Sequence, residues 1–173
     1  MINKFLKIAL LFLSIFSSIA EAKNTIMVTA ATGALGTAIC EQLASEGYDL
    51  LIAGRNSEKI KTLKESLNLK YKEVQVQSII IDFSDIKTIE NASKKVLPNF
   101  LKGIVLVGPR PVLSKNGIPD KNEWAKAFSE TFIAPLEVIR LFELHLQNNG
   151  SLVIISGNSS KNYLPSYPNT NVI

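Results

Sequence analysis

The sequence predicts an α/β fold, in which a doubly wound parallel sheet of five strands in the order 3-2-1-4-5 lies between two layers of helices. Short apolar runs alternate with longer segments of helical periodicity along the chain. Each return to a parallel neighbour requires a crossover over the sheet. The result is a three-layer αβα domain whose ligand is expected at the carboxyl ends of the strands, where the strand order reverses.

Composition is consistent with one folded domain. The 173 residues suffice for a core of their own, and 46% hydrophobic with 20% charged residues is typical of a globular chain. The net charge of +4 is mild and the lysines are interspersed with acids, so no nucleic-acid partner is expected. His145 is the single histidine and Cys40 the single cysteine, which excludes a multi-histidine metal site and an internal disulfide.

The first 22 residues resemble a secretory signal. Lys4 and Lys7 precede an apolar run over 8–19, and small residues at 20–22 are typical of a cleavage site. This run is shorter than the roughly 20 residues that a membrane span needs. A cleaved signal predicts an exported or periplasmic domain over residues 23–173. An uncleaved anchor, the alternative, predicts a membrane-anchored domain facing the cytoplasm, with membrane contact only through this segment.

The first half of the chain contains three expected strands, over 24–30, 48–54 and 74–81. The helix over 35–46 is expected to end at Gly47. The helix over 58–67 is expected to be capped by Asn56 or Ser57, and the helix that follows the third strand is expected to be capped by Ser84 and to run to about residue 96.

The second half supplies the other two strands, over 103–107 and 151–156. The first of them is an uninterrupted apolar run, which is typical of a central parallel strand. A capping box of Asp120 and Glu123 predicts a long helix to about residue 147, bent at Pro135 and ended by Gly150. Trp124 and Phe128 on this helix are expected in the core rather than at a ligand.

The turn after the first strand is built mainly from small residues, Thr29-Ala30-Ala31-Thr32-Gly33-Ala34-Leu35-Gly36. Backbone N–H groups of such a turn converge with the start of the next helix, whose dipole adds partial positive charge. A diphosphate is the usual ligand of this arrangement. An ordinary tight strand–helix turn is the alternative.

Two further candidate binding residues directly follow the second strand. Arg55 and Asn56 occupy the position that contacts the adenosine ribose in dinucleotide-binding folds. A cation at this place suits a 2′-phosphate, because a guanidinium matches phosphate oxygens well. NADP(H) is therefore the expected cofactor, and a solvated surface arginine is the alternative.

These segments together resemble the short-chain dehydrogenase/reductase family over roughly residues 24–173. The family turn Thr-Gly-x-x-Gly-x-x-Gly is matched at Gly33 and Gly36, with Ala30 in place of the first glycine. A methyl group disfavours positive φ. The turn is therefore expected to keep its ability to bind a diphosphate if Ala30 has αR or extended geometry. The resemblance implies a Rossmann-like fold and an NADP(H)-dependent reductase of a small carbonyl or acyl substrate, with 3-oxoacyl-carrier-protein reductases as the subclass.

The resemblance also implies which residues would contact the cofactor. Asp82 would lie near the adenine, with helix capping as its alternative role. Where the family has Asn-Asn-Ala-Gly, this chain has Val107-Gly108-Pro109-Arg110-Pro111, so backbone would border the cofactor. Arg110 would face an anionic substrate, and a solvated loop arginine is the alternative. The implied cofactor-binding residues are Thr29, Ala30, Thr32, Gly33, Ala34, Leu35, Gly36, Arg55, Asn56, Asp82, Phe83, Val107 and Gly108.

The family's catalytic pattern is present with departures. Tyr167 matches the family's acid, but Asn171 stands where the lysine that lowers the tyrosine pKa is expected. Ser156 matches the first of two serines and Gly157 the second, so Ser159 or Ser160 is a possible substitute. Thr131 aligns with the helix asparagine of the family. The candidate catalytic positions are Tyr167, Ser156 and Asn171.

These departures keep two other hypotheses open. One is a catalytically inactive nucleotide-binding or interaction protein, and the other is a nonfunctional truncated fragment. The family continues for two more strands with their helices, so the domain over 23–173 is expected to be incomplete at its C-terminus. A homo-oligomer is expected only for a full-length chain.

Overall fold

The computed structural model describes residues 24–109 and 119–156. Its elements follow in chain order: β1 (Thr25–Val28), α2 (Ala34–Ser45), β2 (Asp49–Gly54), α3 (Ser57–Lys70), β3 (Val76–Ile80), α4 (Ile86–Ser93), β4 (Leu101–Val107), α5 (Lys121–Phe128), the π-helical turn η1 (Ser129–Ile133), α6 (Ala134–Phe142), the 3₁₀ turn η2 (Glu143–His145) and β5 (Leu146–Ile155).

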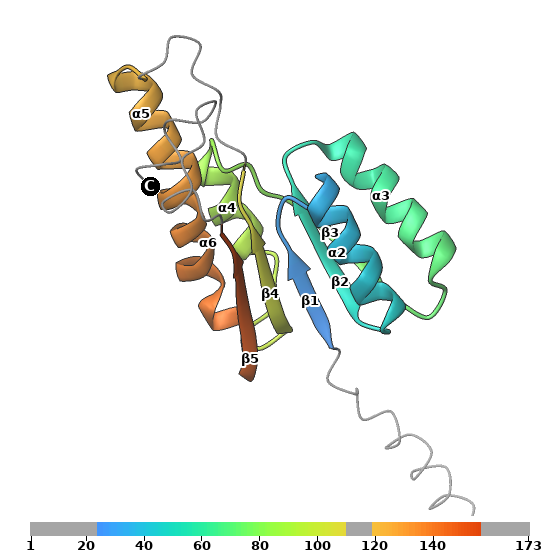
Figure 1. The fold of residues 1–173 in the computed structure, drawn as a ribbon. Helices are drawn as coiled ribbons and strands as arrows, with labels where there is room; N and C mark the ends of the chain where they lie inside the picture. The colour runs from blue at the N-terminus through green and yellow to red at the C-terminus, as the bar shows by residue number, and fades with distance from the viewer. Residues whose placement is uncertain (1–23, 110–118, 157–173) are drawn as a thin grey trace, which may run out of the picture.

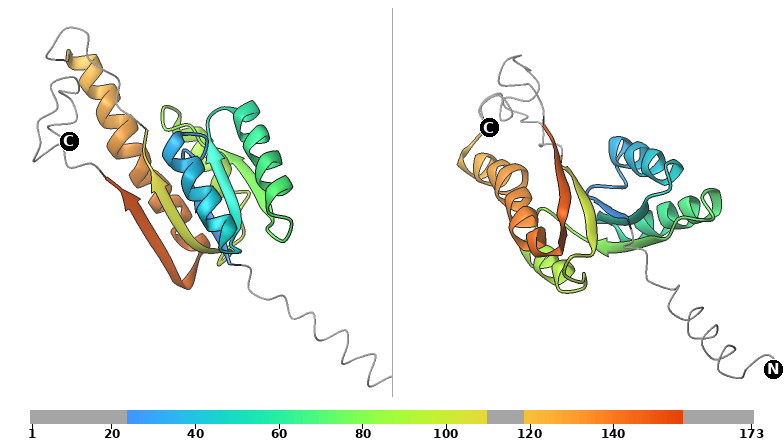
Figure 2. Two further views of the ribbon diagram at one scale, coloured as in Figure 1. Left: turned by 45° about the vertical axis from the view of Figure 1, so that its right-hand side comes forward. Right: turned by 90° about the horizontal axis from the view of Figure 1, so that it is seen from below.

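The five strands form one parallel sheet in the order β3-β2-β1-β4-β5, which confirms the predicted topology. Figures 1 and 2 show α2 and α3 on one face of the sheet, and α4 with α5–α6 on the other. The order reverses between β1 and β4, where Val28 pairs with Ile52 on one side and with Val105 on the other. The carboxyl ends of these strands form the switch point at which a ligand is expected.

Each face of the sheet has its own core, because successive strand residues point to opposite sides. One core joins Met27, Ile104 and Leu106 to α4 and α6, and the other joins Val28, Leu50 and Ile52 to α2 and α3. Cys40 lies in the second core, where burial raises the pKa of its thiol to about 12 and makes it unreactive.

Two of the three predicted helix caps are confirmed. Asn56 Oδ1 accepts a hydrogen bond of 2.9 Å from Lys59 N at the start of α3. Asp120 accepts from the N–H of Glu123, whose carboxylate accepts from Asp120 N, and this completes the capping box of α5. The expected cap Ser84 is wrong, because α4 is capped by Asp85, which accepts from Lys87 N at 3.0 Å.

The long helix after Asp120 differs from its prediction. Pro135 lacks an N–H and cannot donate the usual helical hydrogen bond. The helix has the π turn η1 directly before this residue and then continues as α6. α6 ends at Phe142, well before residue 147. Gly150 does not end the helix; it lies in β5, where pairing with β4 jumps from Leu146 to Ser151. A Cβ at Gly150 would lie 3.0 Å from Gln147 O, so a larger residue would require this bulge to shift by a few tenths of an ångström.

The expected core positions on this helix are wrong for Phe128 and partly wrong for Trp124. Phe128 is 45% exposed, and Trp124 is half-buried. Helical spacing alone did not identify which apolar stripe faces the sheet. The small residues Ala127 and Ala134 pack inward with Val138 and Phe142, which turns Phe128 outward.

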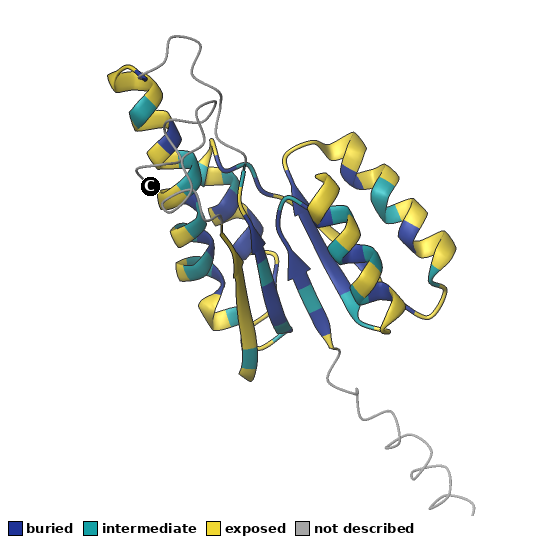
Figure 3. Cartoon of the chain, in the orientation of Figure 1, coloured by how far each residue is buried: buried dark blue, intermediate teal, exposed yellow. Residues whose placement is uncertain are grey.

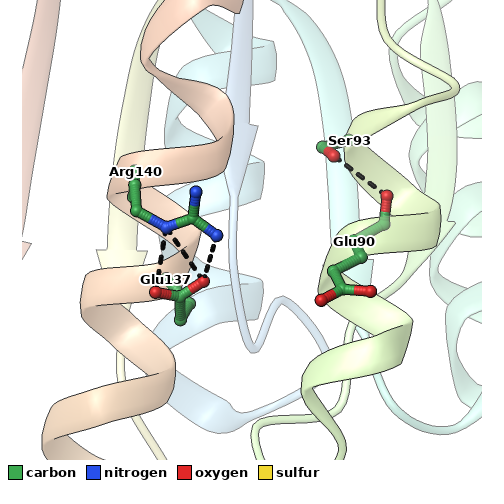
Figure 4. Close-up of polar contacts among 4 residues, drawn as sticks. All are labelled: Glu90, Ser93, Glu137 and Arg140. Carbon is green, nitrogen blue, oxygen red and sulfur yellow. Dashed lines mark hydrogen bonds and ion pairs between the residues drawn. The ribbon is translucent and has the colours of Figure 1, made fainter.

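A charged group lies between α4 and α6 (Figure 4). Arg140 Nη2 donates to Glu137 Oε2 at 2.6 Å and Nε donates to Oε1 at 3.0 Å, so the pair is bidentate. These bonds lower the pKa of Glu137 and raise that of Arg140, to which the charge of Glu90 on α4 adds. Arg140 is exposed and Glu137 is half-buried, so solvent screens the pair, and it orients side chains more than it stabilises the fold.

Across the described residues, the structure has no helix long and apolar enough to span a bilayer. Residues 1–22 lie outside the described residues, so the signal or anchor stays a prediction.

Candidate functional site

The site begins at Thr29, the last residue before β1 turns toward α2. Thr29 is fully buried. Its N–H donates a hydrogen bond of 3.1 Å to Val105 O, which links the end of β1 to β4. Its hydroxyl then donates to Val107 O and accepts from Val107 N, each at 2.8 Å. One hydroxyl thus satisfies both backbone groups of Val107 and joins the carboxyl ends of β1 and β4.

Ala30 is the one residue of the 29–36 turn with a positive φ. Its φ is +45°, in the left-handed region, so the condition of αR or extended geometry at this alanine is not met. The following N–H groups fix the bend, since Ala31 N donates to Ala53 O at 2.9 Å and Gly33 N donates to Ala30 O at 3.0 Å. The turn therefore keeps a glycine-like backbone and carries the strain of one methyl group.

Replacing Ala30 with glycine is expected to raise the free energy of unfolding by about 0.5–1 kcal/mol, because relief of left-handed strain exceeds the entropy added to the unfolded chain. Chemical denaturation measures this change. Ala38→Gly, at an exposed position inside α2, is the control and is expected to lower stability by about 1 kcal/mol. A loss of stability in Ala30→Gly would contradict the strained geometry.

The glycines let the helix start lie close to the turn. A Cβ on Gly36 would lie 2.3 Å from Ala30 O and 2.8 Å from Ala31 Cα, both backbone atoms. A Cβ on Gly33 would lie 3.3 Å from the same oxygen. Gly36 is thus a packing requirement, whereas Gly33 faces solvent together with Ala34 and Leu35.

The start of α2 differs from the starts of α3, α4 and α5. Its N-cap, Gly33, offers no side-chain acceptor, and its first turn contains no acid. α3, α4 and α5 each begin with a side-chain cap. The first N–H groups of any helix lack intrahelical partners, so the exposed start of α2 presents free donors and a positive dipole end to an anion. This donor set fits a diphosphate.

Arg55 directly follows β2 and is exposed. Within the described residues its guanidinium has no ion-pair or hydrogen-bond partner. Asn56 is less available, because its side chain caps α3. Thr32 brings the turn close to the same strand end, since its Oγ1 lies 3.6 Å from where a Cβ of Gly54 would be. The turn and Arg55 therefore share one edge of the sheet.

Asp82 and Phe83 follow β3 but have structural roles. Asp82 Oδ1 accepts from the N–H and the hydroxyl of Ser84, at 3.0 and 2.8 Å. It therefore orders a turn rather than capping α4. Phe83 is only 7% exposed and packs in the core beside α4. Any contribution of Phe83 to a ligand site would come from its backbone.

The ends of β4 and β5 complete the described part of the site. Gly108 is exposed and a Cβ there would meet nothing within 4 Å, so the space beside it is open. Ser156 directly follows β5, whose last residue, Ile155, pairs with Val107. Thr131 is not aimed at a ligand, because its hydroxyl donates to Ala127 O at 2.6 Å. Tyr167, Asn171, Gly157, Ser159, Ser160, Arg110 and Pro111 lie outside the described residues.

The structure thus places five of the expected segments along one edge: the 29–36 turn, Arg55 after β2, Asp82 after β3, Val107 with Gly108 after β4, and Ser156 after β5. The tie between Thr29 and Val107 was not predicted. The sequence signal for this contact is a residue that can both donate and accept a hydrogen bond, directly after a buried strand. The described residues contain no cluster of three or more metal-ligating side chains.

The sheet order, the crossover helices and the small-residue turn at the switch point define a Rossmann-like α/β protein. The family model "short chain dehydrogenase" matches residues 24–169, and the chain belongs to this family.

Several curated relatives and solved structures are similar to the chain. "NADPH-dependent reductase BacG" of Bacillus subtilis is 28% identical over 145 residues, which cover 79% of this chain and 54% of that protein. "Very-long-chain 3-oxoacyl-CoA reductase-A" of Danio rerio is 34% identical over 68 residues, covering 39% and 21%. This chain therefore spans about half, or less, of these two relatives.

Two solved structures share the fold. The NADPH-dependent reductase YwfH, described as involved in bacilysin biosynthesis, has a TM-score of 0.74 at 23% identity and covers 86% of this chain and 61% of that one. An NADPH-bound short-chain oxidoreductase from Pseudomonas aeruginosa, described as containing an atypical catalytic centre, has a TM-score of 0.78 at 15% identity, covering 87% and 60%. At these identities the likeness shows the fold alone.

Proposed function

We propose that this chain binds NADP(H) at the carboxyl edge of its sheet and belongs to an oxidoreductase that reduces a carbonyl group. The observation that carries the proposal is the exposed, uncapped start of α2, at the switch point of the sheet and on the same edge as Arg55. BacG, whose name states NADPH dependence, supports the choice of cofactor. The 3-oxoacyl-CoA reductases among the relatives support an acyl substrate with a 3-oxo group.

The chain's own residues have separable tasks in this proposal. The N–H groups at the start of α2 bind the diphosphate, and the bend at Ala30 keeps that start open. Arg55 binds the 2′-phosphate through its guanidinium fork. Val107 and Gly108 border the cofactor with backbone atoms. When bound, the cofactor supplies the hydride, while Tyr167 donates the proton to the substrate oxygen and Ser156 orients that oxygen.

The replacement Arg55→Asp tests the cofactor. It is expected to weaken NADPH binding by about 10- to 100-fold and to leave NADH binding equal or tighter, because the carboxylate repels the 2′-phosphate and accepts from a free 2′-hydroxyl. Titration of nucleotide fluorescence measures both affinities. Lys61→Asp makes the same charge change at an exposed position on α3 and is the control. If both variants lost the same NADPH affinity, the loss would come from the change in net charge and not from a contact between Arg55 and the 2′-phosphate.

A nucleotide-binding protein without catalysis is the second candidate, favoured by Asn171 at the position of the family lysine and by Gly157 at the position of the second serine. Asn171 is uncharged, so it cannot supply the ammonium that the family lysine provides. The two candidates are separated by NADPH consumption with a 3-oxoacyl substrate. Turnover that Tyr167→Phe abolishes supports the reductase, whereas tight NADPH binding with background turnover supports the second candidate. If the chain bound neither NADPH nor NADH, both candidate functions would be contradicted, and the hypothesis of a nonfunctional fragment would remain.

A further inference from the structure

The most exposed leucines of the described chain lie at one end of the fold. Leu144, Leu69 and Leu97 are 77%, 73% and 69% exposed, more than any other large hydrophobic residue that the structure describes. Leu69 is in the last turn of α3, Leu97 lies between α4 and β4, and Leu144 lies in η2. Helices that cross over between parallel strands end where the next strand begins. All three leucines therefore lie at the amino edge of the sheet, opposite the edge of the proposed cofactor site (Figure 1).

We refer to these three residues as the amino-edge leucines. Two of them are held close together, because His145 Nδ1 donates to Leu97 O and Asn99 N donates to Leu144 O, each at 3.2 Å. These bonds join the loop after α4 to η2. Leu69 lies on the other face of the sheet, with α3 (Figure 2). Figure 3 shows exposed residues at the ends of α3 and α6, from which the chain returns to the sheet. The amino edge thus exposes leucine on both sides of the sheet.

Lysines accompany the amino-edge leucines. Lys72 follows Leu69, and Lys94 and Lys95 precede Leu97. All three lysines are exposed. A lysine stem can lie along apolar groups while its ammonium stays among polar ones. Acidic residues also occupy this edge, so its net charge is small: Glu46, Asp49, Glu73 and Glu143. We therefore expect the leucines to supply most of any attraction, and the lysines to add a preference for an anionic surface.

A flat partner suits this arrangement. The leucines project from elements on opposite faces of the sheet, so one helix or one extended peptide in a groove could not cover all of them, whereas a bilayer surface can. The start of the chain favours the same partner. β1 begins at Thr25 on this edge, and the apolar run over 8–19 precedes it in the sequence. The chain from position 19 to Thr25 can span at most about 20 Å, so an apolar run held in a membrane would keep this edge near the headgroups.

We propose that the amino edge of the sheet is a membrane-docking surface, in which the amino-edge leucines enter the interfacial layer of an anionic bilayer and the neighbouring lysines contact its headgroups. This contact is made by the folded domain and is additional to any that residues 1–22 make. It directs the opposite edge of the sheet, where the proposed cofactor site lies, away from the bilayer. That site then stays open to a nucleotide in solution.

Fluorescence of the full 173-residue chain on vesicles of phosphatidylcholine and phosphatidylglycerol tests the surface. Leu69→Cys, Leu97→Cys and Leu144→Cys each receive a polarity-sensitive dye. Cys40, the single native cysteine, is buried and unreactive, so the dye attaches at the new position. All three dyes are expected to shift to blue emission and to be shielded from an aqueous quencher. Leu35→Cys, at an exposed leucine on the opposite edge, is the control, and its dye is expected to stay in water.

Co-sedimentation with the same vesicles measures how much the leucines contribute. The double variant of Leu97→Glu and Leu144→Glu is expected to partition at least about 10-fold less, because two apolar side chains become charged. Leu35→Glu is the control and is expected to partition like the parent chain. Omitting phosphatidylglycerol is expected to weaken binding by about 3- to 10-fold, since the lysines lose their anionic partners. Circular dichroism confirms that each variant is folded.

Several outcomes would overturn the proposal. They are a chain that does not bind vesicles, dyes at the three leucines that stay in water, and a dye at position 35 that shifts as much as they do. Unchanged partitioning of the double variant would assign the contact to residues 1–22 alone and would overturn the proposal as well. None of these outcomes depends on nucleotide binding, so the proposed function is tested separately.

Discussion

Replacing Gly36 with alanine is expected to lower the free energy of unfolding by about 3 kcal/mol and to abolish NADPH binding. The new Cβ would lie 2.3 Å from Ala30 O and 2.9 Å from Ala30 C, and these are backbone atoms that cannot rotate away. Overpacking of this kind costs about 1–3 kcal/mol, and the upper end applies because the turn itself must move. Moving the turn displaces the N–H groups proposed to bind the diphosphate.

Gly108→Ala is the matched control for Gly36→Ala. It also adds one methyl group to a glycine on the same edge of the sheet, but nothing lies within 4 Å of the new Cβ. We expect its stability to be unchanged or slightly higher. Chemical denaturation and NADPH titration of both variants provide the measurements. A Gly36→Ala chain as stable as the parent would show that the turn is looser than the structure indicates.

Replacing Thr29 with valine is expected to cost about 2–4 kcal/mol of stability, because it removes one hydroxyl and leaves two buried backbone groups of Val107 without partners. The shape of the side chain is nearly unchanged, so the loss reports hydrogen bonding rather than packing. Since Val107 borders the proposed cofactor site, NADPH binding is expected to weaken as well.

Two comparisons make the Thr29 result interpretable. Thr29→Ser keeps the hydroxyl and is expected to retain most of the stability and nucleotide affinity. Thr62→Val removes a hydroxyl that bonds Glu58 O on the exposed side of α3, and is expected to change stability by less than about 0.5 kcal/mol. If Thr29→Ser lost as much stability as Thr29→Val, the loss would come from the methyl group of Thr29 rather than from its hydroxyl.

The strand order, the crossover helices and the small-residue turn were predictable because each rests on local pattern. Alternating strand and helix segments leave few topologies once parallel pairing is imposed. Asn56 and Asp120 were identified as caps because a side chain that accepts from the backbone two or three residues later is a local interaction. The prediction that Ser84 caps α4 was wrong, because Asp82, Ser84 and Asp85 are all residue types that suit a cap. The geometry of the turn selects among them.

The sequence by itself determined the α/β class, the sheet order and the position of the small-residue turn, since these follow from hydrophobic periodicity and from where small residues fall. Only the tertiary structure decided that Ala30 keeps a left-handed backbone, that the Thr29 hydroxyl ties β1 to β4, and that Phe128 faces outward. Each of these depends on contacts between residues far apart in the chain, and periodicity carries no information about which neighbour a side chain meets.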